Sequence, residues 1–221
     1  MSLPVFKGIE MEMLTFIAEC GVEKHYPVGK IIFQQGDICD HFAILLDGEI
    51  SFSFFSEQGK EVVVSEAAPG SVIGGAEIVL GCAWMANAST TKDSTALAFG
   101  RPALTKLLTH APFAKVLMTS LGLMVRETMA FAENLAIHPL ETRLARFLIA
   151  MSETHGRPVG DGIQIDRILP QGRIGQMINA SRPKINAQLR AWHSRNVIRL
   201  SDSRIVILDQ PALRSLSRQD G

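Results

Sequence analysis

The chain has 221 residues, of which 47% are hydrophobic and 20% are charged, a composition that argues against intrinsic disorder and suits one large domain or two small ones. Its 22 basic and 22 acidic side chains cancel, so the net charge gives no sign of nucleic acid, an anionic membrane or an acidic substrate. The two parts of the chain nevertheless carry opposite charges. Residues 1–137 hold 9 basic and 15 acidic side chains, a charge of −6, whereas residues 138–221 hold 13 and 7, a charge of +6 with twelve arginines. Such asymmetry points to a nucleic-acid-binding segment.

The cysteines and the apolar segments indicate the compartment. The three cysteines (Cys20, Cys39 and Cys82) are too scattered for a disulfide framework and form no C-x-x-C pair, which favours reduced thiols in a cytosolic protein. Residues 1–13 lack the apolar run of a signal peptide, and the most lipid-like stretch, Val116–Val125, is too short to span a bilayer. We therefore expect a cytoplasmic protein that does not contact a membrane.

A helix is expected over Glu10–Cys20, and β-structure follows it. Short runs of branched and aromatic residues predict strands at Ile31–Phe33, Phe42–Leu46, Ile50–Phe55, Val62–Ser65 and Ala96–Phe99. Glycines spaced by 12, 11 and 11 residues mark turns at Gly36, Gly48, Gly59 and Gly70, and Asp47-Gly48 is a strong hairpin signal. This even alternation of strand and turn favours a sandwich or a barrel-like roll over a parallel α/β sheet.

A long helix is predicted from Pro112 to Ile137. Its apolar residues step by four and three positions, a heptad seam that predicts pairing with a second copy of the helix; the alternative is a helix that lies on its own domain. The seam consists of Leu117, Leu121, Met124, Thr128, Phe131 and Leu135. Its one polar member, Thr128, either bonds back to its own helix or faces a ligand.

After His138-Pro139 the pattern changes again. The predicted elements are an amphipathic helix over Leu140–Met151, a loop over Gly156–Gly162, a strand at Ile163–Ile165, helices at Gln171–Ile178 and Ser181–Ser194, and a hairpin that joins Ile198–Leu200 to Arg204–Leu208 through a turn at 201–203. This order of elements is typical of a winged helix-turn-helix.

The second of the two adjacent helices carries the predicted chemistry. Ser181 is a favourable N-cap, Pro183 fits the first turn, and Ile185, Leu189 and Trp192 give the helix one buried face. Major-groove reading needs such a fixed helix, with side chains at its N-terminal end that reach base edges. The candidates are Ser181, Arg182 and Lys184 at that end and Gln188 and Arg190 on the exposed face.

These candidates divide by the DNA group that each suits. Arg182 suits a guanine and Gln188 an adenine, whereas phosphate contacts are expected of Arg173, Lys184, Arg190, Arg199 and Arg204. The alternative is a solvated helical hairpin whose charges only keep it soluble. We favour DNA binding because twelve arginines, a capped second helix and a following wing coincide.

Five motifs spread over nearly the whole chain carry a family resemblance. They are Tyr26–Asp37, Asp47–Ile50, Pro69–Gly74, Thr91–Ser94 and, most specifically, Ile174-Gly175-Gln176 with Ala180-Ser181-Arg182. They resemble the Crp/Fnr superfamily of transcription regulators, the group of the cyclic-AMP receptor protein. The resemblance implies an α+β protein that binds a palindromic double-stranded DNA operator as a homodimer.

The resemblance also implies three parts. Residues 1–111 form an effector-sensing, cyclic-nucleotide-binding-like β-roll (a double-stranded β-helix or jelly roll). Residues 112–137 form the dimerisation helix, and residues 138–221 form the winged helix-turn-helix DNA-binding domain. In the reader helix the family's glutamate and second arginine are replaced by Pro183 and Ala187. The operator is therefore expected to differ from the family's usual half-site.

The effector pocket departs from the family as well. In that pocket a Gly-Glu pair holds the ribose and an Arg-Ser-Ala run holds the cyclic phosphate, whereas this chain has Gly74-Gly75-Ala76-Glu77 and Trp84-Met85-Ala86. Without the arginine the phosphate loses a charge-assisted partner. We therefore expect no response to cyclic AMP of the usual kind. The candidate pocket residues are Gly74, Gly75, Glu77, Trp84, Met85 and Thr128, and Trp84 and Met85 either close an apolar pocket or pack it shut.

We expect an unknown small-molecule effector or none, and no metal, haem or iron–sulfur cluster. The scattered cysteines cannot supply a cluster, and isolated histidines are more often structural than axial ligands. A cupin-like small-molecule enzyme would need a His-x-His pair, and no two histidines lie closer than 16 residues apart. An effector-independent regulator, a protein-binding scaffold and contact with RNA polymerase are alternatives that the sequence leaves open.

Overall fold

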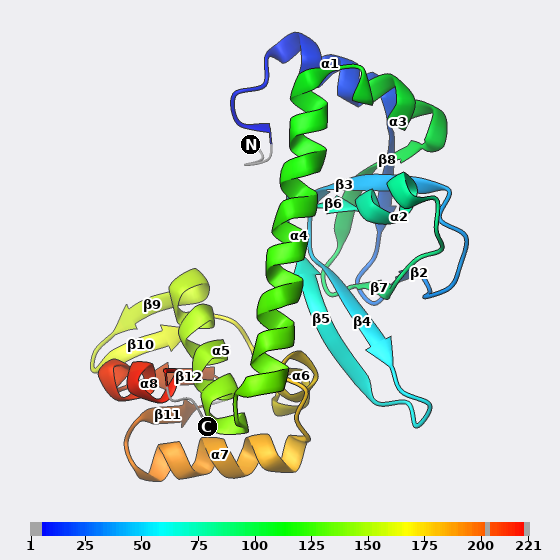
Figure 1. Ribbon diagram of the computed structural model, residues 1–221. Coiled ribbons are helices and arrows are strands. Elements are labelled where there is room, and N and C mark those ends of the chain that lie inside the picture. The colour runs from blue at the N-terminus through cyan, green and yellow to red at the C-terminus, as the bar shows by residue number, and fades with distance from the viewer. Residues whose placement is uncertain (1–5, 202–203, 219–221) are drawn as a thin grey trace. The chain divides into compact units, whose positions relative to one another are not determined.

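The computed structural model describes residues 6–201 and 204–218 and divides the chain into two units, residues 1–128 and 129–221. The division falls inside the longest helix, α4 (Ala111–Ile137), which begins one residue before the predicted Pro112 (Figure 1). Within the described ranges, no single helix has both the length and the apolar composition of a membrane span, although α3 (Arg101–Leu108) and α4, bent by 113°, pass that test together.

Two four-stranded antiparallel sheets form the N-terminal unit. One sheet contains, in spatial order, β1 (Val22–Tyr26), β8 (Ser94–Gly100), β3 (His41–Asp47) and β6 (Val72–Ile73). The other contains β2 (Ile31–Phe33), β7 (Asn87–Thr90), β4 (Ile50–Phe55) and β5 (Glu61–Ala67). Strands distant in sequence pair, since Phe42 lies opposite Phe99 and Ile50 lies opposite Thr90. The arrangement confirms the predicted roll.

Every predicted strand of the roll is present, and elements that the sequence did not predict complete it. These are β1, β6, β7 and two short helices, α2 (Gly75–Leu80) and α3. The glycines of the predicted turns adopt left-handed backbone conformations, with φ of 92° at Gly48 and 98° at Gly70. A residue with a Cβ atom adopts such angles only at a cost, so the glycines allow the strands to reverse.

One apolar core holds the two sheets and the neighbouring helices together. Phe42 and Phe99 stack with ring centroids 4.8 Å apart, and the ring of Phe113 from α4 lies 6.1 Å from that of Phe42. Ile17 from α1 (Met11–Cys20) and Leu107 from α3 are buried in the same core. The start of α4 therefore belongs to the N-terminal unit by packing as well as by position.

The C-terminal unit has the predicted winged helix-turn-helix order, followed by a last helix that the sequence did not predict. Its elements are α5 (Leu140–His155), β9 (Gly156–Val159), β10 (Gly162–Ile165), α6 (Gln171–Met177), α7 (Arg182–Ser194), β11 (Ile198–Ser201), β12 (Arg204–Ile207) and α8 (Gln210–Leu216). The four strands form one antiparallel sheet in the order β11-β12-β10-β9. The core beneath α7 is built from Leu144, Leu148, Ile174, Ile185, Leu189 and Trp192.

One prediction for this unit is wrong, and another concerns residues that the structure does not describe. The segment 156–162, predicted as a loop, begins with strand β9, which pairs with β10 along its whole length. The prediction was wrong because glycine and proline in β9 signal a loop, yet an edge strand tolerates both. Residues 202 and 203 of the predicted 201–203 turn lie outside the described residues.

Candidate nucleic-acid interface

A tight turn links α6 to α7. Gly175 is buried, and a Cβ atom added there would collide with the carbonyl oxygen of Ala180. The Ala180 amide donates to the Gly175 carbonyl at 2.8 Å, and Asn179 takes the left-handed conformation with φ of 52°. Glycine is therefore required where the family motif has it, because the chain folds back over its own backbone.

Helix α7 begins and packs as its sequence predicts, with one difference. Ser181 occupies the N-cap position and Pro183 lies in the first turn, but the Ser181 side chain makes no capping hydrogen bond. Ile185, Leu189 and Trp192 are buried, with at most 1% of their surface exposed. Burial of that face leaves Ser181, Arg182, Lys184 and Arg190 exposed on the rest of the helix.

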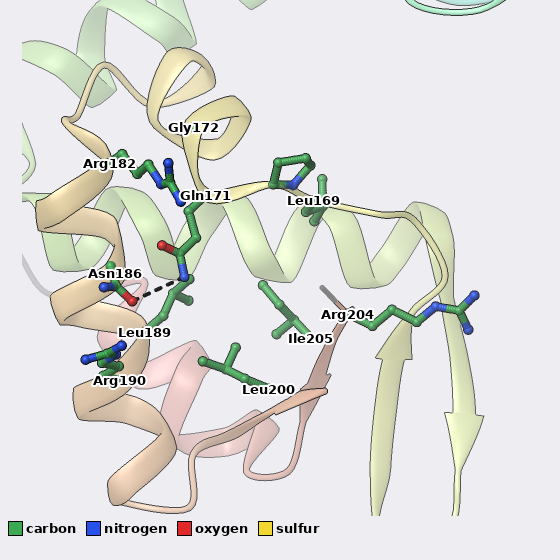
Figure 2. A pocket seen from close by; sticks show the side chains of 11 residues that line it. Leu169, Gln171, Gly172, Arg182, Asn186, Leu189, Arg190, Leu200, Arg204 and Ile205 are labelled. Carbon is green, nitrogen blue, oxygen red and sulfur yellow. Dashed lines mark hydrogen bonds between the residues drawn. The ribbon is translucent and has the colours of Figure 1, made fainter. Parts of the chain in front are cut away.

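A cleft of about 700 Å³ lies between α7 and the hairpin of β11 and β12 (Figure 2). Arg182, Asn186 and Arg190 follow one another along the side of α7 that lines it, and Arg204 lines it from β12. Gln171 from α6 completes the polar lining, and the apolar lining consists of Leu169, Pro170, Leu189, Leu200 and Ile205. Arg182 and Arg190 place two guanidinium groups along the α7 side of this concave surface, whereas the guanidinium of Arg204 points away from α7 (Figure 2). Cationic groups beside a concave surface suit a polyanion such as a nucleic-acid backbone.

Other predicted contact residues are engaged by neighbouring side chains. Arg199 forms a double hydrogen bond with the carboxylate of Asp161, one of the two contacts measuring 2.9 Å. That hydrogen bonding lowers the pKa of the Asp161 carboxyl below its ordinary value and raises the pKa of Arg199. Arg204 lies 3.8 Å from Asp166. Arg173 lies on α6, outside the cleft lining, and donates to Gln176 at 3.5 Å.

Gln188, the predicted adenine contact, is held by helix α5. Its Nε2 donates to Oε1 of Glu141 at 3.1 Å, and Nε1 of the buried Trp192 donates to the same oxygen at 3.1 Å. Arg143, also on α5, donates through Nη1 to the carbonyl of Ile178 at 2.7 Å. Burial lowers the pKa of this guanidinium. Glu141 and Arg143 thus fasten both helices of the motif to α5, two roles for which the sequence pattern carries no signal.

The candidate effector pocket contains a buried indole. Trp84 is 3% exposed and stacks on Phe33, with ring centroids 3.5 Å apart and an interplanar angle of 9°. The ring of His41 lies nearly perpendicular to the same indole, with centroids 5.5 Å apart and an interplanar angle of 70°. A Cβ atom added at Gly74 would lie 2.5 Å from the indole, so Gly74 leaves the space that the ring fills.

The remaining candidate pocket residues are dispersed. Gly75 packs against α4, since a Cβ atom there would lie 3.1 Å from Leu117. Met85 is 42% exposed, and its amide donates to Oε1 of Glu77 at 3.4 Å. Thr128 is exposed, and its hydroxyl donates to the Met124 carbonyl at 2.8 Å. Thr128 therefore bonds back to its own helix, one of the two alternatives that the sequence left open.

The predicted seam of α4 is divided between two environments. Leu117 is buried in the core of the N-terminal unit and Leu121 packs against that core, so these two residues serve their own domain. Met124 is 41% exposed, and Phe131 and Leu135 are half-buried. Further exposed apolar side chains on α4 are Met118, Leu123, Val125, Met129 and Ile137.

No metal site is evident in the described part of the chain. No group of three or more His, Cys, Asp or Glu side chains that could hold an ion occurs within residues 6–201 and 204–218.

Comparison with known proteins decides the family. A cyclic nucleotide-binding domain model matches residues 23–111, and a Crp-like helix-turn-helix domain model matches residues 142–216. The CRP-like cAMP-activated global transcriptional regulator of Mycobacterium tuberculosis is 23% identical over 215 residues, which cover 97% of this chain and 96% of that protein. The chain belongs to the Crp/Fnr family of transcription regulators.

Further Crp/Fnr proteins are similar over most of their length. The global nitrogen regulator of Synechococcus elongatus is 26% identical over 213 residues, 92% of this chain and 96% of that protein. Among solved structures, the c-di-GMP responsive global regulator CLP of Xanthomonas campestris gives a TM-score of 0.78 at 15% identity, with 90% of this chain and 99% of that chain covered. A CooA mutant from Carboxydothermus hydrogenoformans gives 0.79 at 17% identity, with 94% of both chains covered.

These two structural likenesses support the fold alone, and the family models support a regulator that binds DNA. The relatives are regulators, in agreement with the expectation that this Crp/Fnr protein is not an enzyme. A cyclic nucleotide-binding domain is also a domain built to receive a small-molecule effector.

Proposed function

We propose that this Crp/Fnr protein regulates transcription as a homodimer that binds a palindromic operator in sequence-specific fashion. The observation that carries the proposal is the cleft of the C-terminal unit, where Arg182 and Arg190 of α7 line a concave surface beside an exposed helix N-terminus and Arg204 of β12 lies at its edge. Arg182 contacts a guanine in the major groove, and Arg190, Arg204 and Lys184 contact phosphates. The charge of +6 on residues 138–221 draws this unit to DNA, while residues 1–137, at −6, stay away from it.

The proposal assigns a role to each part of the chain. Residues 1–111 sense an effector, residues 112–137 join two copies, and residues 138–221 bind DNA. The exposed apolar side chains of α4, among them Val125 and Met129, support the dimer, because a helix with this composition is stabilised when a second helix covers it. Two copies related by two-fold symmetry match an operator with two-fold symmetry.

The sensor pocket is atypical, and Trp84 supports this part of the proposal. Its indole packs on Phe33 in the position that the family resemblance gives to the phosphate-binding arginine. A cyclic phosphate therefore meets an apolar ring where it needs a charge-assisted partner. The protein does not bind cyclic AMP in the usual way, and it responds to a different small molecule or to none. Isothermal titration calorimetry with cyclic AMP is expected to give no binding heat; a saturable one-site titration would overturn this part.

Substitution of Arg182 tests the proposed DNA contact. Duplexes are first selected from a random pool by the full-length wild type, and affinities are then compared by gel shift at fixed salt. We expect Arg182→Ala to abolish specific binding while sedimentation still gives a dimer. Arg195→Ala, at the C-terminal end of the same helix, removes the same charge away from the cleft and is expected to retain specificity. Equal affinity and sequence preference for Arg182→Ala and the wild type would contradict the assignment.

A further inference from the structure

The two amide side chains of α7 face different surroundings. Gln188 donates to Glu141 on α5 at 3.1 Å, and this carboxylate also holds the indole of the buried Trp192. Asn186 lies two residues earlier, about 200° away around the helix, and lines the cleft. Gln188 is thus committed to packing within the domain, and Asn186 lies on the side of α7 that carries Arg182 and Arg190.

Asn186 is held in place by a side chain of the preceding helix. Nε2 of Gln171, the first residue of α6, donates to Oδ1 of Asn186 at 3.3 Å, the contact drawn as a dashed line in Figure 2. Asn186 is half-buried, so its amide has few alternative orientations. The contact joins the two helices of the motif by a side-chain bond and limits rotation of the Asn186 amide. An amide fixed in this way loses little entropy when it binds a base.

The hydrogen-bonding groups that remain on Asn186 match one base edge. After the bond from Gln171, Oδ1 keeps a second lone pair and Nδ2 keeps two N–H donors. Adenine presents, in the major groove, an N6 donor beside an N7 acceptor, which an asparagine amide binds with both of its polar atoms. Guanine presents two acceptors at the same place and cannot satisfy Oδ1.

We infer that Asn186, positioned by Gln171, reads an adenine in the operator half-site. Asn186 lies four residues after Arg182, a rise of about 6 Å along α7, and successive base pairs are about 3.4 Å apart. The adenine therefore lies within about two base pairs of the guanine that Arg182 contacts. This inference rests on the proposed function, and it gives the reading role expected of Gln188 to its neighbour on the other side of the helix.

Selection from a random duplex pool by the full-length wild type and four variants tests the inference. The wild type is expected to enrich an adenine near the guanine contact, and Asn186→Ala is expected to reduce that preference by roughly 10- to 100-fold while the guanine preference persists. Asn186→Asp presents two acceptors and no donor, so its preference at the same position is expected to shift towards cytosine, whose N4 group donates. Gln171→Ala is expected to weaken the adenine preference by a smaller factor, because Asn186 is retained but less well positioned.

Gln188→Ala is the matched control, because it truncates an amide on the same helix that points to α5. It is expected to leave the base preferences unchanged, and circular dichroism melts are used to check that each variant is folded. An adenine preference that is lost in Gln188→Ala and kept in Asn186→Ala overturns the inference and leaves the proposed function standing. A selection in which the wild type enriches no motif overturns the proposed function, and the inference with it.

Discussion

Trp84 lies face to face with Phe33, with ring centroids 3.5 Å apart and planes inclined by only 9°. The two rings come from the end of β2 and from the segment between α2 and β7, so the stack joins parts of the roll that are distant in sequence. The Trp84 amide also donates to the Asp37 carbonyl at 2.9 Å, and its carbonyl accepts from the Gly36 amide at 2.9 Å. The indole is therefore fixed by its backbone as well as by its ring, and its position is a structural part of the roll.

Truncation of this indole is expected to destabilise the protein. Trp84→Ala removes a large side chain that is 3% exposed and leaves a cavity, and we expect it to lower the free energy of unfolding by about 3–5 kcal/mol. Urea unfolding followed by circular dichroism measures the loss. Met85→Ala truncates the adjacent side chain, which is 42% exposed, and is expected to cost about 0.5 kcal/mol or less. Similar losses for the two variants would show that Trp84 does not fill the roll.

Gly74 and Trp84 are expected to be energetically coupled. Gly74 has φ of 75°, and its missing Cβ atom leaves room for the indole, so Gly74→Ala brings both backbone strain and a clash. In the Trp84→Ala background only the strain remains, and Gly74→Ala is expected to cost about 1–3 kcal/mol there and clearly more in the wild type. A double-mutant cycle with urea unfolding measures the difference. A coupling energy of zero would mean that the indole of Trp84 does not occupy the space left by the missing Cβ atom of Gly74.

Much of the fold was predictable because it follows from local chemistry. The spacing of the turn glycines predicted the strands of the roll, and the recurrence of Ile185, Leu189 and Trp192 predicted the buried face of α7. The missed elements have weak local signals. β1 is an edge strand whose first four residues are exposed, and β7 is the short polar run Asn87–Thr90. Such strands form because a neighbour already presents a free edge to them, which periodicity does not show.

The candidate site was predictable in its charges and less so in its contacts. Arg182, Arg190 and Arg204 all contribute to the lining of one cleft, as a basic motif followed by a wing suggested. The bonds that decide which amide is available depend on tertiary placement. Glu141 lies 47 residues before Gln188 in sequence, and Gln171 lies 15 residues before Asn186. No spacing rule within one helix could have separated the roles of Asn186 and Gln188.

A lysine on the apolar seam of α4 is expected to weaken the dimer. Thr128 is exposed one turn after Met124, and in the dimer a charge there would lie in an apolar interface. We expect Thr128→Lys to raise the dimer dissociation constant at least about tenfold, as measured by analytical sedimentation. Glu127→Lys places the same charge about 100° away around the helix, where the wild type already carries a charge, and is expected to leave the dimer intact. An unchanged dimer dissociation constant in Thr128→Lys would contradict the placement of Thr128 in the dimer interface.

The ion pair between Asp161 and Arg199 predicts a carboxyl that titrates at low pH. Hydrogen bonding from Arg199 holds the pKa of Asp161 below its ordinary value of about 3.9. A carboxyl whose pKa is lower in the folded state stabilises the fold above its unfolded pKa, and this contribution is lost as the pH falls through the folded pKa. In an NMR titration, the pKa of Asp161 is expected to return to its ordinary value in Arg199→Ala.

Arg157→Ala serves as the control for this titration. Arg157, on strand β9, has its Nε 3.8 Å from Oδ1 of Asp166 and not beside Asp161, so its removal is expected to leave the pKa of Asp161 low. A pKa of Asp161 that does not change in Arg199→Ala would show that the pair does not persist in solution. In that case Arg199 would be free for the phosphate contact that its sequence position suggests.

Loss of the Glu141 carboxylate is expected to destabilise the C-terminal unit. In Glu141→Ala the buried Nε1–H of Trp192 loses its acceptor, and an unsatisfied buried donor costs about 1–3 kcal/mol. Glu141→Gln keeps an amide oxygen as acceptor, so a smaller loss is expected. Urea unfolding of the full-length protein measures both. Glu153→Ala, on the same helix, breaks an exposed ion pair with Arg214 and is expected to cost less than about 1 kcal/mol, because water screens such pairs. If Glu141→Ala cost no more than Glu153→Ala, the carboxylate would not be what fastens α7 to α5.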